Sequence, residues 1–274
     1  MRHDSDGQLF PVSQERHGER RWRRFESYAF AGSMRAVPLS LAEIDAAAAA
    51  LPVGLADRPG GPVAVALLRP AAGGPAPFVG PGGRWRGTYV PAALRVHPFS
   101  ARVAGDDGQM VLLVDEGTGL VGDDPQGEPF FDANGQPARL LAEVVDFLRA
   151  HAGSEMQARR AAAALAQAGL LRPMTAQAGM AAEDAEGFLC VDPQAFEGLP
   201  ETALADLWRC GALRLAQAQL VSQHHFGWIA RALAAGLGDT VSIAARPADT
   251  AEADIGGFLS ALAASHAADR GGAS

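Results

Sequence analysis

One short stretch of the chain gathers the side chains best suited to recognising another molecule. Trp85, Tyr89, Arg95 and His97 stand in it, and two prolines fix the direction of its backbone. The Arg95 guanidinium can hold an anionic group, and the His97 imidazole can carry a proton near neutral pH. We take these four residues as candidates for binding a ligand or partner, and the sequence assigns no catalytic residues.

The same stretch predicts a packed cluster as well as a binding surface. Its aromatic side chains have large areas to bury, and a buried aromatic usually contacts other rings or cations. We therefore expect Trp85, Tyr89, Arg95 and Phe99 to form one partly buried cluster where the sheet meets the helices.

A metal site is the next chemistry to consider. His17 and Glu19 have the His-x-acid spacing of facial-triad iron sites, which need a further histidine such as His97, His224 or His225. This spacing arises easily by chance, so we expect no metal and no cofactor. For His225 we expect a half-buried, hydrogen-bonded side chain in a helix.

Two charged segments allow alternative interpretations. The run from 16 to 25 interleaves arginines with aromatics, which suits a nucleic acid or phosphate ligand or, as we favour, a solvated charged face. The acidic segment from 115 to 135 suggests calcium, but it lacks the ligand spacing of a calcium loop. Solvated loops are the preferred interpretation of that segment.

Missing residue types exclude several reaction classes. The chain has no lysine, which removes Schiff-base chemistry, a phosphate-binding P-loop and a kinase-type lysine. No nucleophile elbow and no zinc-protease motif is present. Cys190 and Cys210 do not form a Cys-x-x-Cys pair and have no base beside them in the sequence, so we expect both to act as small core side chains.

Composition restricts the partners and the compartment. The 274 residues are 48% hydrophobic with a net charge of −8, so a core can form and nucleic acid is not an expected partner. We find neither a signal peptide nor an apolar run long enough to span a membrane. The expected location is the cytoplasm, and the oligomeric state stays open.

Apolar periodicity predicts strands first and helices afterwards. A Ser40–Glu43 capping box opens the first helix, and Gly-rich turns bound the strands. The expected strands are 62–69, 99–103, 110–114 and 187–192, and the expected helices are 40–51, 137–151, 154–171, 202–210 and 213–233.

The fold class that follows is α+β. We expect a mainly antiparallel sheet in the N-terminal half, helices packed on one side, and a helical C-terminal subregion. The expected parts are a flexible segment at 1–15, a single domain at 16–235 (strand-rich over 16–135, helix-rich over 136–235) and a weakly structured tail at 236–274.

An ordered set of short segments resembles the SapC family of bacterial proteins between about His17 and Leu233. The segments are Tyr28-Ala-Phe-Ala, Val37-Pro-Leu, Leu41-Ala-Glu43, Leu51-Pro52-Val53, Gly83-Arg-Trp85, Tyr89-Val-Pro91, Arg95-Val-His-Pro98-Phe99, Pro129-Phe-Phe-Asp132-Ala-Asn-Gly135, Gly169-Leu-Leu-Arg-Pro173 and Leu207-Trp-Arg-Cys-Gly-Ala-Leu213. Val96 and His97 stand where the family pattern, Arg-Arg-Tyr-Pro-Phe, has Arg and Tyr. A ligand contact that depends on the Arg-Arg pair of the family is therefore not carried over to this chain.

The resemblance implies a non-catalytic accessory or binding protein associated with a bacterial surface-layer or nutrient-uptake system. It supplies no catalytic residues, and it implies a protein partner or a small ligand. The alternative is an enzyme, metal-dependent or metal-free, that acts on a peptide or small molecule. In it Arg95 holds an anionic group and His97 carries the proton.

Overall fold

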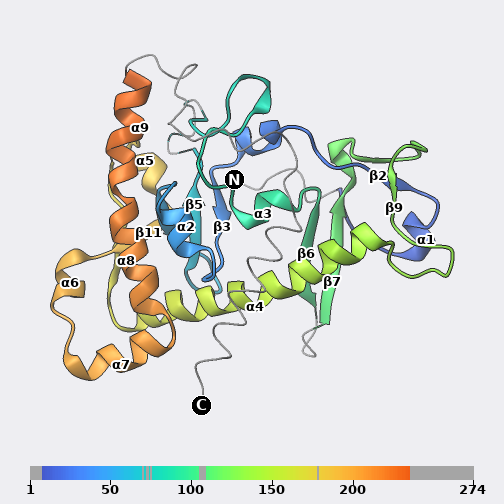
Figure 1. Cartoon of the computed structure of the whole chain (residues 1–274). Coiled ribbons are helices and arrows are strands. Elements are labelled where there is room, and N and C mark those ends of the chain that lie inside the picture. The colour runs from blue at the N-terminus through green and yellow to red at the C-terminus, as the bar shows by residue number, and fades with distance from the viewer. Residues whose placement is uncertain are drawn as a thin grey trace. The chain divides into compact units, whose positions relative to one another are not determined.

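The computed structural model of the chain describes residues 8–234 apart from 70, 72, 73, 75, 105–108 and 178 (Figure 1). The chain divides into the units Met1–Ala244 and Ala245–Ser274, and all described residues belong to the first. The tail expected at 236–274 lies outside the described residues. No helix of the described part is long and apolar enough to cross a membrane.

Strands dominate the first half of the described residues and helices the second. The strands are β1 (Leu9–Pro11), β2 (Arg21–Trp22), β3 (Ala36–Pro38), β4 (Val53–Ala56), β5 (Val63–Leu67), β6 (Phe99–Ala104), β7 (Gln109–Asp115), β8 (Val121–Gly122), β9 (Glu128–Pro129), β10 (Leu171–Pro173) and β11 (Phe188–Val191). The α-helices are α1 (Gln14–His17), α2 (Ile44–Ala48), α3 (Ala92–Arg95), α4 (Arg139–Gln167), α5 (Ala182–Ala185), α6 (Pro193–Glu197), α7 (Glu201–Arg209), α8 (Ala212–Ser222) and α9 (His224–Ala234), and the 3-10 helices are η2 (Tyr28–Ser33), η3 (Pro81–Gly83) and η4 (Glu116–Thr118).

All pairings between these strands are antiparallel. The largest sheet has the order β10-β11-β4-β5-β3, and two smaller sheets have the orders β1-β7-β6 and β8-β2-β9. The predicted strands β5 and β11 and the predicted antiparallel pairing of β6 with β7 are confirmed, and the turn expected at 105–108 lies outside the described residues. The fold is α+β, as the sequence pattern indicates.

Two adjacent inner strands of the largest sheet, β4 and β5, are buried on both faces, which explains their nearly continuous apolar sequences. Every residue of β4 and β5 is buried. Successive side chains of a strand point to opposite faces. Val53, Leu55, Ala64 and Ala66 enter the larger core cluster, and Ala56, Val63, Val65 and Leu67 enter the smaller one. Helices α2, α4 and α8 supply much of the larger cluster.

Side-chain hydrogen bonds fasten α8 to this sheet. Gln219 and Ser222 are fully buried. The side-chain oxygen Oε1 of Gln219 accepts from the Val191 amide at 3.1 Å, and the Ser222 hydroxyl accepts from the Val53 amide at 2.9 Å. The Gln223 amide group donates to the Val53 carbonyl at 2.9 Å. Because buried polar groups are costly without partners, these bonds fix where α8 crosses β4 and β11.

The prediction of two helices over 137–171 is wrong. One helix, α4, runs unbroken through Gly153 and extends from β6 to α7 and α8 (Figure 1). Glycine costs about 1 kcal/mol relative to alanine in a helix interior, which is less than tertiary contacts supply. Beside it the Ser154 hydroxyl accepts from the Ala42 amide at 2.8 Å, and the Ser154 carbonyl accepts from the Leu41 amide at 3.2 Å. These contacts hold the helix where the sequence suggested a break.

Two further predictions need correction. The segment 1–15, expected to be flexible, includes β1, in which Phe10 pairs with Val114 of β7. The single helix expected over 213–233 is two helices, α8 and α9, with Gln223 between them. In both places long-range hydrogen bonds to a strand decide the local structure, and a sequence window does not contain the partner.

Candidate functional site

The Glu43 carboxylate is the centre of the region that the sequence singled out. Glu43 is buried, and its Oε1 accepts from the Ser40 amide at 2.9 Å and the Ser40 hydroxyl at 3.0 Å. Its Oε2 accepts from the Tyr89 hydroxyl and from the Ala92 amide, both at 2.8 Å. The capping box therefore forms in part: Glu43 reaches back to Ser40, while the serine hydroxyl donates to the carboxylate.

Trp85, Tyr89 and Arg95 meet beside this carboxylate, and all three are half-buried. The Trp85 indole donates to the Tyr89 carbonyl at 2.9 Å, and the Arg95 guanidinium lies 4.9 Å from the centre of the Tyr89 ring. The Arg95 Nε donates to the Val90 carbonyl at 2.8 Å. For these three residues the expected cluster is present.

Phe99 does not join this cluster. It is buried at the start of β6, where it packs edge-on against Trp22 at 4.9 Å and against Phe130 at 6.1 Å between ring centres. The reason is that Phe99 already belongs to the strand, whose side-chain direction is set by the β6–β7 ladder. The prediction for Phe99 is wrong.

His97 lies at the far end of a row of aromatic rings that begins at Trp85. The Trp85 ring lies 5.5 Å from Tyr28, Tyr28 lies 6.1 Å from Phe30, and Phe30 stacks on His97 at 3.8 Å with 11° between the planes. Burial lowers the pKa of His97 against the opposing influence of Asp115, so the neutral imidazole is favoured at pH 7.

The polar groups of this region are engaged within the chain. Burial raises the pKa of the Tyr89 hydroxyl, and the neighbouring Glu43 carboxylate raises it further, so the hydroxyl stays protonated and donates. Glu43 accepts four hydrogen bonds, two on each oxygen. To act as a base it would have to break one of these bonds. The arrangement suits packing and positioning better than proton transfer.

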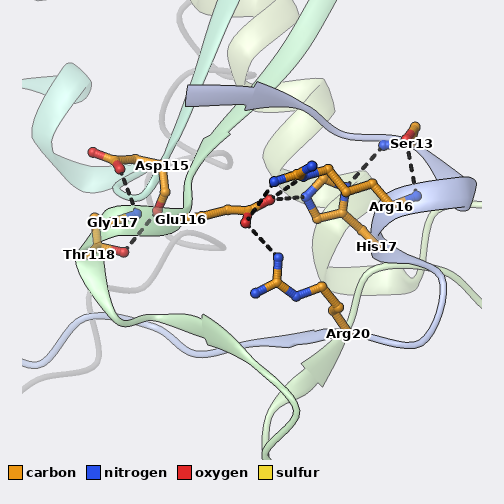
Figure 2. A network of polar contacts seen from close by, with 8 residues as sticks. All are labelled: Ser13, Arg16, His17, Arg20, Asp115, Glu116, Gly117 and Thr118. Carbon is orange, nitrogen blue, oxygen red and sulfur yellow. Dashed lines mark hydrogen bonds and ion pairs between the residues drawn. The ribbon is translucent and has the colours of Figure 1, made fainter. Parts of the chain in front are cut away.

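A second carboxylate network lies at the end of β7, around Glu116 (Figure 2). Arg16 forms a two-pronged contact, with Nε 2.6 Å from Oε1 and Nη2 3.2 Å from Oε2. Arg20 Nη1 lies 2.6 Å from Oε2, and His17 Nε2 lies 3.2 Å from Oε1. Hydrogen bonding to the two arginines lowers the pKa of Glu116 to about 2 although partial burial opposes it.

His17 is fully buried between this carboxylate and the amide of Ser13. The Ser13 N–H donates to Nδ1 at 3.3 Å, so the proton of the neutral ring sits on Nε2 and is donated to Glu116. The ring also packs 4.8 Å from Phe130. Burial lowers the pKa of His17, with Glu116 opposing, so this corner holds a neutral histidine.

The basic run and the acidic segment neutralise each other. Arg16 and Arg20 contact Glu116, and Arg23 lies 3.3 Å from Asp124, while Trp22 between them is buried. The expected solvated face holds for Arg16 and Arg23, which are exposed, and the expected solvated loop holds for the Asp124 side chain, which is 41% exposed. Trp22, by contrast, is buried, and the Glu116 side chain is only 13% exposed. Arg20 lies beyond the end of α1, so its convergence with Arg16 on Glu116 is decided by tertiary structure.

The residues proposed for a metal site do not converge. His17 points into the protein toward Glu116, whereas Glu19 is exposed. Among the described residues there is no group of three or more His, Cys, Asp or Glu side chains placed to hold a metal ion. His225 is half-buried, and its Nε2 lies 2.9 Å from the Ala48 carbonyl, as expected of a hydrogen-bonded histidine.

The two cysteines are unpaired and pack against the core. Cys190 is buried on β11 and Cys210 is half-buried after α7. Burial raises the pKa of the Cys190 thiol, which keeps it in the less reactive protonated form. Both cysteines are packing residues, as predicted.

The family comparison matches the greater part of the chain. The sequence profile of the SapC family matches residues 12–228. This chain belongs to the SapC family. No curated protein and no solved structure matches it in the corresponding searches.

Several segments that carry the resemblance to SapC proteins meet around Glu43. Four of those segments supply one residue each to a single network, which contains Glu43, Trp85, Tyr89 and Arg95. Gly83 has φ +76°, and a Cβ there would lie 1.8 Å from the Ser27 hydroxyl, so the turn before Trp85 requires glycine. These SapC motif residues build the fold of this region.

The sequence interpretation missed the most exposed large apolar side chain of the described residues. Trp208 of α7 is 73% exposed, and Leu204, one turn earlier, is 38% exposed. In the sequence, Leu204, Leu207 and Trp208 have the spacing of an ordinary core-facing stripe. Only the structure shows that Leu207 alone of the three is buried. Trp208 therefore joins the candidate residues of this SapC protein.

Proposed function

We propose that this SapC protein is a non-catalytic accessory protein that binds a protein partner in the cytoplasm, in association with a surface-layer or nutrient-uptake system. The observation that carries the proposal is Trp208, which is 73% exposed on a helix held against the core. Exposed aromatic side chains on a fixed helix are typical anchors of protein–protein interfaces. Family membership supports the accessory role.

The residues around Glu43 form their contacts within the chain, which also supports binding over catalysis. Tyr89 donates to Glu43, Trp85 donates to the Tyr89 carbonyl, and His97 stacks on Phe30. An enzyme would need such groups directed at a substrate. In our proposal, Trp85, Tyr89, Arg95 and His97 support the fold, and α7 meets the partner.

The test is affinity capture from the native host, with proteins and small molecules analysed together. We expect a reproducible protein partner that is lost on Trp208→Ala and kept on Val221→Ala. Val221 is the matched control because it is 62% exposed on the neighbouring helix α8. A retained metabolite that the purified protein converts, without any protein partner, would contradict the proposal.

A further inference from the structure

One side of α7 carries an exposed stripe of three side chains. Glu201, Leu204 and Trp208 are separated by three and four residues, so they lie on the same side of the helix. All three are exposed, whereas Leu207 on the other side is 5% exposed and belongs to the larger core cluster. The helix therefore presents an acidic end followed by two apolar side chains.

The stripe stands on a well-fixed support. Helix α7 packs against α8 and α4, and it begins directly after Pro200. Gly211 joins α7 to α8 with φ +77°, and a Cβ at this position would lie 2.5 Å from the Leu41 side chain. Because the turn fits closely against the core, a partner on the stripe would meet a surface that needs little ordering.

Charge at the stripe favours one kind of partner. Glu197 and Glu201 are exposed carboxylates on α6 and α7, and the only basic side chain of α7, Arg209, pairs with Asp206. The whole chain has a net charge of −8. The negative charges of Glu197 and Glu201 disfavour a second copy of this acidic chain and attract arginine or lysine on a partner.

We infer that the α7 stripe binds a basic amphipathic helix of a partner protein. Its apolar side chains pack on Leu204 and Trp208, and an arginine or lysine meets Glu201. This inference rests on the proposed binding function and adds the chemistry of the partner. A helix suits the stripe because apolar residues spaced by three and four match those of another helix.

The experiment uses the full chain and two fluorescent synthetic helices with the same leucine face, one flanked by lysines and one by glutamates. Fluorescence anisotropy measures binding to wild type, Trp208→Ala, Glu201→Arg and the control Val221→Ala. We expect the basic helix to bind wild type and the control equally, and Trp208→Ala about tenfold more weakly, as for a central interface aromatic. Glu201→Arg should weaken the basic helix and strengthen the acidic one. Circular dichroism verifies that each variant is folded.

Four results would overturn the inference. Equal affinity of the basic helix for wild type and Trp208→Ala would show that the helix does not bind at α7. If Glu201→Arg prefers the basic helix over the acidic helix as strongly as wild type does, Glu201 does not select a basic partner. Dimerisation of the protein alone in analytical ultracentrifugation, abolished by Trp208→Ala, would assign the stripe to a second copy. A host partner still captured by Trp208→Ala would leave the accessory role standing but would show that α7 is not where the partner binds.

Discussion

Glu43 and Glu116 are two carboxylates that each accept four hydrogen bonds from entirely different donors. Glu43 receives two backbone amides and two hydroxyls, all uncharged. Glu116 receives two arginines and a histidine. Glu43 is buried, with 6% of its surface exposed, and the Glu116 side chain is 13% exposed beside arginines that are 30% and 44% exposed.

The difference indicates what each site contributes. Three of the four donors of Glu43 belong to Ser40 and Ala92, which are buried, and the fourth belongs to Tyr89, which is half-buried. Removing the carboxylate would leave the buried donors without access to water, so the packing of these segments depends on that group. The arginines around Glu116 are partly exposed, so water can hydrate them when the carboxylate is absent. Ion pairs of this kind contribute little to stability. Glu43 therefore holds the SapC motif segments together, whereas Glu116 positions the segment from Arg16 to Arg20 at the end of β7.

Removing the Glu43 carboxylate should have the largest effect. We expect Glu43→Ala to lower the free energy of unfolding by about 4 kcal/mol, since it leaves several buried donors unpaired at about 1 kcal/mol or more each. Urea denaturation measures this. Glu43→Gln keeps one acceptor oxygen and should lose less. A Glu43→Ala protein as stable as wild type would show that the donors find other partners.

Trp85→Ala tests whether packing around Glu43 matters as much as its hydrogen bonds. The Trp85 ring packs 5.5 Å from Tyr28 and 6.0 Å from Phe78. We expect a loss of about 3 kcal/mol, the usual scale for truncating a packed aromatic. The matched control is Trp208→Ala, which should change stability by about 0.5 kcal/mol or less because Trp208 is exposed. Equal melting temperatures for Trp85→Ala and Trp208→Ala would argue against a structural role for Trp85.

Glu116→Ala should cost less than either change on the Glu43 side. The variant frees two arginines to water but leaves the buried Nε2–H of His17 without its acceptor. We expect a loss of about 1 kcal/mol, mostly from that one unpaired donor. Thermal unfolding by circular dichroism would detect it. A loss as large as that of Glu43→Ala would remove the distinction between the two carboxylates.

The last expected effect is a difference in acid sensitivity. The folded pKa of His17 lies below its ordinary 6.5, so as the pH falls below 6.5 the unfolded chain takes up a proton that the folded one excludes. The folded pKa of Glu116 is about 2 against an ordinary 4.5, so its contribution is full above pH 4.5 and is lost as the pH falls toward 2. Both changes destabilise the fold in acid.

Glu116→Gln separates these two contributions. Between pH 4.5 and 2 the variant should lose less stability than wild type, because it has no carboxylate to protonate at this position. Urea denaturation at a series of pH values gives the comparison. Parallel curves for the two proteins would show that Glu116 does not titrate differently in the folded and unfolded states.

Local patterns in the sequence predict much of the fold and part of the site. The strand β5, the β6–β7 hairpin and the contact between Ser40 and Glu43 follow from residues close together in the chain. Apolar periodicity, turn residues and capping act over a few positions, which is why a window of sequence contains the whole signal.

The partners of the two carboxylates are decided by tertiary structure. Arg16 reaches Glu116 across 100 positions, and Tyr89 reaches Glu43 across 46. The unbroken course of α4 through Gly153 also depends on contacts with distant segments. The exposure of Trp208 is of the same kind, because its helical spacing is that of a buried residue. Sequence periodicity tells which side chains share a face, and only the packing of the other elements determines which faces are covered.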